Sequence, residues 1–363
     1  MKKILKKIDF RELGILYALI AVWIILFCVK EQFRNFSTYV SILRQASFAG
    51  IAGVGMTLCI ASKHFDQSIG SMFAFLGCTF TALLIAFGRP LPEGTELVGG
   101  GAAGVQTGGI DFPGVLAAIF LTLALSVLCG LFNGVLVAKL RIPAFIVTLG
   151  TLNIFRGSAY IVSDGLPTVI NAVTTKEEYQ FFNFLGTGSL VLPISFLFMV
   201  ICAVAGNIIL RRMKLGRDTL AIGNSVEASR ISGINIDRTK LLIFALLGLF
   251  VGLMTIFNTT FLASSNPGMG RGFEFTVITT VVLGGTALAG GKASIFNTIV
   301  AAHFLVTLTV GMNALEISSY WQRIIQGIIL IFAFSINTIR AKVENLRVKA
   351  TARRESIAKE SAS

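Results

Sequence analysis

Ten long apolar stretches alternate with short polar connectors along this chain. Each approaches the roughly 20 residues that a helix needs to cross about 30 Å of hydrocarbon. In lipid each must be helical, because an open strand leaves its backbone groups unpaired. We therefore predict an all-α integral membrane protein with about ten transmembrane helices. The stretches are Leu13–Val29, Ala46–Ser62, Ile69–Phe87, Gly114–Ala138, Ala144–Val162, Ser189–Leu210, Leu241–Ala263, Phe275–Gly291, Ser294–Gly311 and Trp321–Ile339.

The distribution of basic residues predicts the orientation of these helices. Lys and Arg accumulate in the cytoplasmic connectors of membrane proteins. With the N-terminus inside, the inner connectors and ends carry 23 of them and the outer connectors 7. We therefore expect a multi-pass protein of the plasma (inner) membrane, N-in and C-in. Residues 1–12 and 340–363 would be cytoplasmic ends of a transmembrane permease domain spanning residues 13–339.

Composition and motifs argue against several other classes of protein. The basic residues lie in short connectors and at the two ends, which disfavours a nucleic-acid partner and favours a lipid membrane. The five cysteines are isolated in apolar stretches and the two histidines are far apart, so we expect no metal and no cofactor. Residues 285–292 resemble a phosphate loop, but Thr286 and Ala293 stand where it needs Gly and Ser or Thr. We therefore expect no ATPase site and no catalytic residues.

The connector Leu215–Lys240 is polar and basic, yet apolar residues recur in it at helical spacing. Ala228, Ile231 and Ile234 fall on one face, with charged residues beside them. We predict a cytoplasmic amphipathic helix that docks a soluble partner. The alternative is a helix lying on the bilayer surface. The predicted coupling residues are Glu227, Ala228, Ser229, Arg230 and Gly233.

Three polar residues lie close to or inside the apolar stretches, where polar groups are costly and often functional. Asp66 precedes Ile69, so it either caps the next helix or belongs to a pathway or gate. Asn133 lies well inside a stretch and must hydrogen-bond, more readily to another helix than to a substrate. Arg156 either reaches the interface or another helix, or lines a substrate path.

Several stretches together resemble the permease subunits of bacterial ABC importers, in the ribose-type simple-sugar group. Glu227-Ala228-Ser229 followed by Gly233 is similar to the family's EAAxxxG segment, and Phe65–Ser71 resembles its DLSVGS stretch, with Gln67 in place of Leu. The resemblance covers roughly residues 40 to 340. The other matching stretches are Gly130–Gly134, Ala138–Thr151, Arg156-Gly157, Asp164-Gly165, Ala221–Asn224, Val282–Thr286 and Gly290-Gly291.

This resemblance implies a transport subunit that uses the ATP hydrolysed by another chain. Its expected partners are a cytoplasmic ATP-binding subunit, an external sugar-binding protein and a second permease subunit, identical or related. The expected substrate is a monosaccharide or a similar small polyol. The alternative is a secondary transporter driven by an ion gradient, which needs intramembrane acids. Acids occur only at the edges of the stretches, at Asp66 and Glu274.

Overall fold

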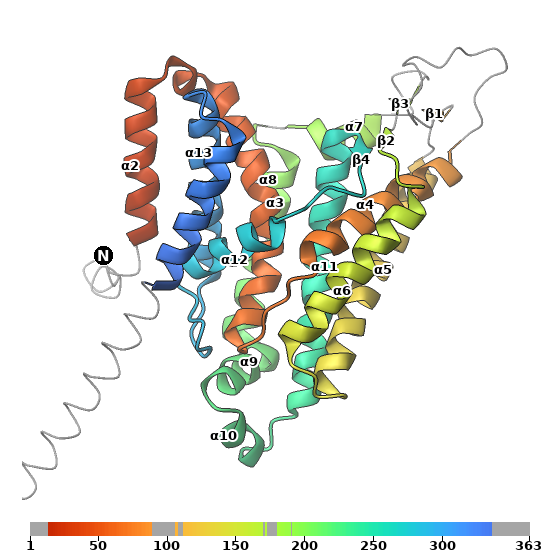
Figure 1. The fold of residues 1–363 in the computed structure, drawn as a ribbon, viewed down its shortest axis with the longest axis vertical. Coiled ribbons are helices and arrows are strands. Elements are labelled where there is room, and N and C mark those ends of the chain that lie inside the picture. Colours follow the sequence, from red (N-terminus) through yellow and green to blue (C-terminus); the bar gives the residue numbers. More distant parts are fainter. Residues whose placement is uncertain are drawn as a thin grey trace, which may run out of the picture.

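The computed structural model describes residues 14–88, 106–107, 112–169, 171–172, 180–189 and 191–335. In these ranges the chain forms a helical bundle, with two-residue strands at one end (Figure 1). The predicted ends, residues 1–12 and 340–363, lie outside them. The helices are α2 (Gly14–Val29), the 3-10 helix η1 (Glu31–Arg34), α3 (Phe36–Ala61), α4 (Ile69–Ala86), α5 (Phe112–Ala138), α6 (Ala144–Val162), α7 (Gln180–Thr187), α8 (Ile194–Arg212), α9 (Lys214–Asn224), α10 (Val226–Ile231), α11 (Ile236–Leu262), α12 (Phe273–Leu283), α13 (Ile295–Ala314) and residues 319–335.

The strands form two small sheets that tie connectors together. β1 (Gln106–Thr107) pairs in parallel with β3 (Asn171–Ala172). β2 (Thr168–Val169) pairs antiparallel with β4 (Ser264–Ser265), so the connector after α6 meets the end of α11.

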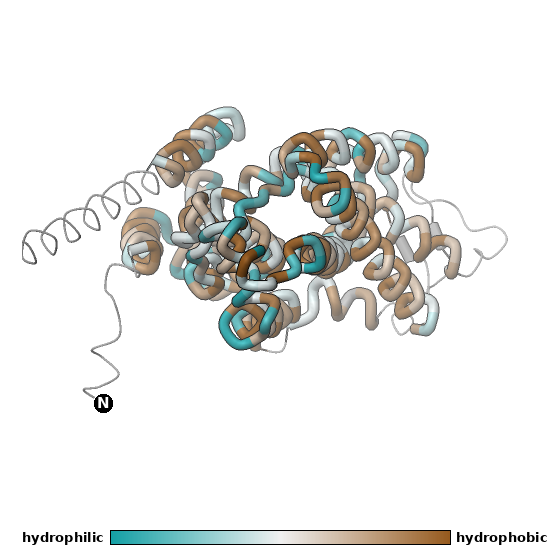
Figure 2. Tube along the Cα trace, turned by 90° about the horizontal axis from the view of Figure 1, so that it is seen from below, coloured by the Kyte–Doolittle hydropathy of each residue, from teal (hydrophilic) through white to brown (hydrophobic). Residues whose placement is uncertain are grey.

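Seven of the described helices are long and apolar enough to cross a membrane, which confirms an all-α membrane protein. They are α3, α4, α5, α6, α8, α11 and α13. Figure 2 views the bundle from the end that carries α9 and α10 and shows hydrophobic residues along most of the helical trace. Many apolar side chains on α5 and α6 are exposed, as expected for surfaces that face lipid.

One predicted span is not a continuous helix. The stretch Phe275–Gly291 is helical only as part of α12, whose 11 residues cover about 16 Å at 1.5 Å per residue. The helix stops at Leu283, just before Gly285, whose φ is +87°, and Gly290 and Gly291, with φ values of +78° and +79°, keep the residues that follow out of a helix. This left-handed backbone favours glycine and cannot continue an α-helix.

The centre of the bundle is α3, whose central residues from Ile51 to Ile60 are buried. It begins ten residues before the predicted start at Ala46, so Arg44 lies in a helix rather than in an outer connector. Arg44 donates from Nη2 to the Thr187 carbonyl at 3.1 Å, and its guanidinium carbon lies 5.1 Å from the centre of the Phe261 ring. The Arg44 guanidinium is therefore held by a backbone carbonyl and a phenyl ring.

The connector between α3 and α4 reaches deep into the protein. It runs from the end of α3 back into the bundle before α4 begins (Figure 1). Asp66 on this connector is fully buried. The short helices α9 and α10 lie at the end of the bundle where α3 finishes (Figure 1).

Candidate functional site

The predicted docking connector folds as two short helices rather than one. α9 is followed directly by α10, whose N-cap Ser225 accepts a hydrogen bond from the Ala228 backbone N–H at 3.2 Å. Gly233, with φ +77°, lies two residues after the end of α10. Ser225 and Gly233 therefore mark the two ends of this turn-and-a-half of helix.

The residues predicted for coupling lie on and just after α10, and most of them face solvent. Glu227, Ala228 and Arg230 are exposed, whereas Ser229 is buried and donates to the Ser225 carbonyl at 2.8 Å. Ile231 is 87% exposed. Ile234 lies beyond the end of α10, so the predicted apolar face is reduced to Ala228 and Ile231. This small apolar face has no partner within the described chain.

Asp66 and Asn133 meet inside the bundle. The Asp66 carboxylate accepts from the Ser68 backbone N–H at 2.7 Å, the Ser68 hydroxyl at 2.6 Å and Asn133 Nδ2 at 3.0 Å. Asn133 therefore bonds the connector between α3 and α4, with no substrate involved, rather than the body of another helix. Asp66 is not the N-cap of α4, because Ser68 takes that position. Asn133 Oδ1 is buried and finds no hydrogen-bond partner in the described structure.

Arg156 holds the non-helical segment that precedes α12. Its Nη1 donates to the carbonyls of Pro267 and Met269, at 2.6 and 2.7 Å. Arg271 on the same segment donates from Nη2 to the Tyr160 hydroxyl at 2.9 Å. Arg156 therefore does not reach for the membrane interface. It pins residues 264–272 to α6.

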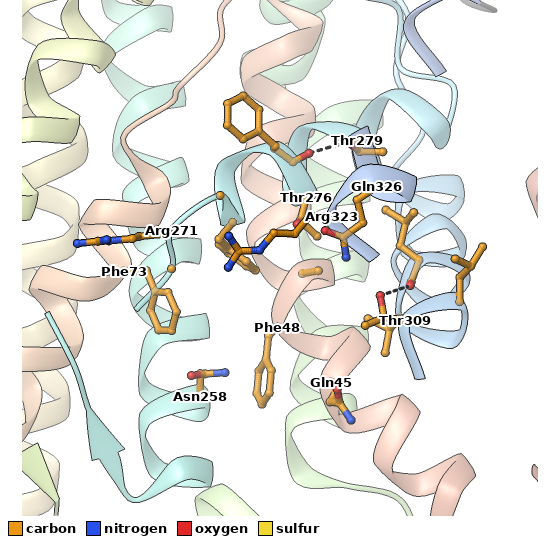
Figure 3. A pocket seen from close by; sticks show the side chains of 18 of the residues that line it. Gln45, Phe48, Phe73, Asn258, Arg271, Thr276, Thr279, Thr309, Arg323 and Gln326 are labelled. Atoms are coloured by element: carbon orange, nitrogen blue, oxygen red, sulfur yellow. Dashed lines mark hydrogen bonds between the residues drawn. The ribbon is translucent and has the colours of Figure 1, made fainter. Parts of the chain in front are cut away.

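A cavity of about 1030 Å³ lies between α3, α11, α12, α13 and residues 319–335 (Figure 3). Its apolar wall includes Phe48, Phe73 and Phe273. Its polar side chains include Gln45, Asn258, Thr276, Thr309, Arg323 and Gln326. Figure 3 shows Arg323 reaching toward the middle of this space, whereas Arg271 points away from it.

The chemistry of this cavity suits a small polar solute that carries no positive charge. Asn258, Arg323 and Gln326 make no hydrogen bonds to the described part of the chain, so their donors and acceptors remain available to a solute. None of the described residues that line the cavity is acidic. Amide and guanidinium groups hydrogen-bond hydroxyls, and phenyl rings pack against the apolar faces of a ligand.

Sequence reasoning missed this cavity because its polar residues come one or two at a time from separate helices. The only local signal is a polar residue in an otherwise apolar helix, such as Asn258 near the end of α11. Of the three polar residues singled out from the sequence, none lines the cavity. Arg156 touches the segment that does, since Gly270 to Phe273 form part of the wall.

A helical bundle with exposed apolar faces, a largely apolar cavity that carries several polar side chains and an exposed short helix at one end is typical of a membrane transport subunit. Comparison with known proteins agrees. Residues 38–334 match the family described as "Branched-chain amino acid transport system / permease component". The chain belongs to this family of permeases. It is therefore a multi-pass protein of the plasma membrane.

Its relatives within the family include several sugar permeases. The chain is 33% identical to the ribose import permease of Escherichia coli (strain K12), covering 89% of this chain and 92% of the relative. It is 31% identical to the ribose import permease of Bacillus subtilis (strain 168), covering 89% and 91%. The L-arabinose transport system permease of Escherichia coli (strain K12) is 34% identical, covering 90% and 92%. No solved structure matches the chain.

The Asp66 site predicts an unusual dependence of stability on pH. Burial raises the pKa of the Asp66 carboxyl, and this outweighs the opposing hydrogen bonds from Ser68 and Asn133. A carboxyl with a raised folded-state pKa stabilises the fold below the unfolded value of about 3.9. That contribution is lost as pH rises through the pKa of the folded state, because the fold then holds a buried negative charge.

We therefore expect Asp66→Asn to become more stable relative to the wild type as pH rises from about 4 through the raised folded-state pKa of Asp66, by a few degrees in Tm. The new amide can still accept from Ser68, and it can donate to Asn133 Oδ1 once the Asn133 amide rotates. Thermal unfolding of purified protein in detergent measures the difference. Asp164→Asn, at an exposed acid, is the matched control and should show no such trend. A difference that stays constant with pH would contradict the assignment.

Proposed function

We propose that this permease carries a monosaccharide or similar small polyol into the cell, using ATP hydrolysed by a separate chain. The relatives named above import ribose and L-arabinose, which supports the substrate class. The observation that carries the proposal is the cavity, with its amide and guanidinium side chains, its phenyl rings and no acid along its described wall. That lining complements hydroxyl groups and gives a coupling cation no carboxylate to bind.

The proposed orientation places α10 in the cytoplasm and the cavity toward the outside, in a ten-span chain with both ends inside. The charge count supports it. Asn258 lies four residues before the end of α11, and α11 starts just after α10. Thr309 similarly lies five residues before the end of α13. The polar wall is thus near the end of the bundle opposite α10, where an external sugar-binding protein can deliver its sugar.

The three polar residues found from the sequence shape this path without lining it. Arg156 positions residues 264–272, which contribute Gly270 to Phe273 to the cavity wall. Asp66 and Asn133 fix the start of α4, which contributes Phe73. We assign all three to positioning the gate and wall rather than to contact with the sugar.

We assign docking of the cytoplasmic ATP-binding subunit to α10. An isoleucine that is 87% exposed on a helix between charged residues is suited to a protein partner with an apolar pocket and a polar rim. Glu227 lies in the first turn of α10, where its negative charge also suits the helix dipole.

We expect Glu227→Lys to reduce sugar uptake at least tenfold while leaving the permease inserted in the membrane. The reversed charge opposes the partner, but the Ser225 cap that starts α10 remains. Uptake and co-purification of the ATP-binding subunit are the measurements. Glu316→Lys makes the same charge change at an exposed site beyond α13 and serves as the control. Normal uptake and co-purification with Glu227→Lys would count against docking at α10.

We place a second permease subunit against the exposed face of α6. Exposed residues recur on this face at intervals of four and three residues, at Ile146, Gly150, Asn153 and Gly157. Nothing lies within 4 Å of a Cβ built on Gly150 or Gly157. Small residues let two membrane helices approach closely, and an exposed amide can hydrogen-bond across the contact.

A cysteine at position 153 should therefore form a disulfide between two copies in the membrane. The test uses Asn153→Cys in a Cys28→Ser background, because Cys28 is the exposed native thiol within the described ranges. Leu128→Cys, at an exposed position on α5, is the matched control. Mild oxidation followed by non-reducing gel electrophoresis should give a dimer with the first variant only. Equal dimer formation by both variants would remove α6 as the interface.

The energy source separates this proposal from a secondary transporter. We expect membrane vesicles that contain the permease and its co-purified ATP-binding subunit to take up labelled pentose, delivered by the binding protein, only when ATP is present on the cytoplasmic side. A proton or sodium gradient alone should give no uptake. Uptake that follows the ion gradient and ignores ATP would establish the rival mechanism.

A further inference from the structure

The end of α9 contacts two connectors that lie far from it in the sequence. One is the α3 end and the residues after it, where Lys63 Nζ donates to the Asn224 carbonyl at 3.4 Å. The other is the glycine-rich connector between α12 and α13, which packs on Gly223 and Asn224. These two connectors also bond each other, since the Gly291 N–H donates to the Ala61 carbonyl at 2.9 Å. Three separate segments thus meet at one junction.

The junction is built backbone against backbone. A Cβ built on Gly223 would overlap the Ala61 carbonyl oxygen and the Gly291 nitrogen. A Cβ built on Gly290 would lie 2.7 Å from the Gly223 carbonyl oxygen, and one built on Gly291 would overlap the Asn224 side chain. Apart from the Asn224 and Lys63 side chains, backbone meets backbone here, so the segments cannot slide past one another without breaking close contacts.

The junction connects the segment that leads to α10 with segments that lead to the cavity wall. On one side Asn224 is followed by the N-cap Ser225 and then by α10, which carries the proposed docking face. On the other side the glycine connector follows α12, whose Phe273, Thr276 and Thr279 line the cavity. Ala61 likewise ends α3, which lines the cavity further along its length. At this junction α10 is joined to the wall of the cavity by contacts between segments that are distant in the sequence.

We propose that Gly223 and Gly291 are positioning residues that lock α9 and α10 to the α3 end and the α12–α13 connector as one rigid body. A displacement of α10 then moves α12 directly, and with it the cavity wall. This inference rests on the proposed function, because it assumes that an ATP-binding subunit moves α10. It assigns the transmission to a contact between distant segments rather than to α8 and α11, which flank the docking segment in the sequence.

The first test separates ATP hydrolysis from transport. Gly223→Ala pushes the segments apart at the junction and Gly291→Ala displaces the Asn224 side chain from it, while both leave α10 intact. We expect the assembled complex to keep hydrolysing ATP while sugar uptake per ATP falls at least tenfold. A loss of folding would lower both activities together and leave that ratio unchanged. Ratios within twofold of the wild type, in variants that keep wild-type ATP hydrolysis, would overturn the proposal.

Two control variants match the backbone effects of these substitutions. Gly165→Ala introduces a side chain at φ +74°, close to the +79° of Gly291, where no atom lies within 4 Å. Gly14→Ala adds a methyl group to a helical glycine that is equally free of neighbours. Both should keep the wild-type ratio. If Gly165→Ala uncouples as strongly as Gly291→Ala, backbone strain rather than the junction is responsible and the proposal fails.

A second test covers the case in which the alanine variants fail to insert. Lys63→Cys with Asn224→Cys places two thiols across the junction in the Cys28→Ser background, and a short cleavable reagent can bridge them. Because the proposal makes the two segments move together, bridging should leave ATP-driven uptake within twofold of the unbridged protein. Uptake that stops on bridging and returns on cleavage would show that the segments separate, which overturns the proposal.

Measurements on the wild-type complex separate a failure of the junction proposal from a failure of the proposed function. If it shows no ATP-dependent uptake, the proposed function is wrong and the junction loses its role with it. If the wild type transports but the junction variants keep their coupling, only the junction proposal is lost.

Discussion

A bilayer offers no water to unpaired backbone groups, and this constraint governs every place where the bundle departs from helix. Three non-helical segments lie between or within its helices, and each is held by a polar contact from a distant part of the chain. Asn133 donates to the Asp66 carboxylate, Arg156 donates to the carbonyls of Pro267 and Met269, and the Gly291 N–H donates to the Ala61 carbonyl. These polar contacts hold the non-helical segments in place against distant parts of the chain.

The broken segments in turn create the cavity. α12 is too short to cross the membrane, and the segment before it places Gly270 to Phe273 in the wall. Unbroken helices packed side by side would have filled this space with apolar side chains. The same interruption places the glycine connector beside α9. The interruption of this one predicted span therefore contributes both to the cavity wall and to the contact with α9.

Much of this architecture could be predicted from the sequence, because burial in lipid leaves a strong signal in apolar stretches. The helical class, the polar docking connector and the pairing of Asn133 with another segment all follow from residue type and position. The failures share one cause. Local composition does not reveal contacts with residues that are distant in the sequence. Arg44 contacts Thr187 and Phe261. The glycines at the end of the Phe275–Gly291 stretch pack against Asn224. The cavity was missed because it belongs to no single stretch.

The exposure of Ile231 has a consequence for the life of the protein in the cell. If α10 docks a cytoplasmic partner as proposed, a subunit made in excess of that partner leaves this isoleucine uncovered in the cytosol, on a short helix that chaperones and proteases can reach. Under that proposal membrane insertion leaves Ile231 exposed, and assembly with the partner covers it. The ratio of subunits in finished transporters would then be set by the removal of orphan chains rather than by balanced synthesis, with the docking helix serving as the mark of an incomplete complex.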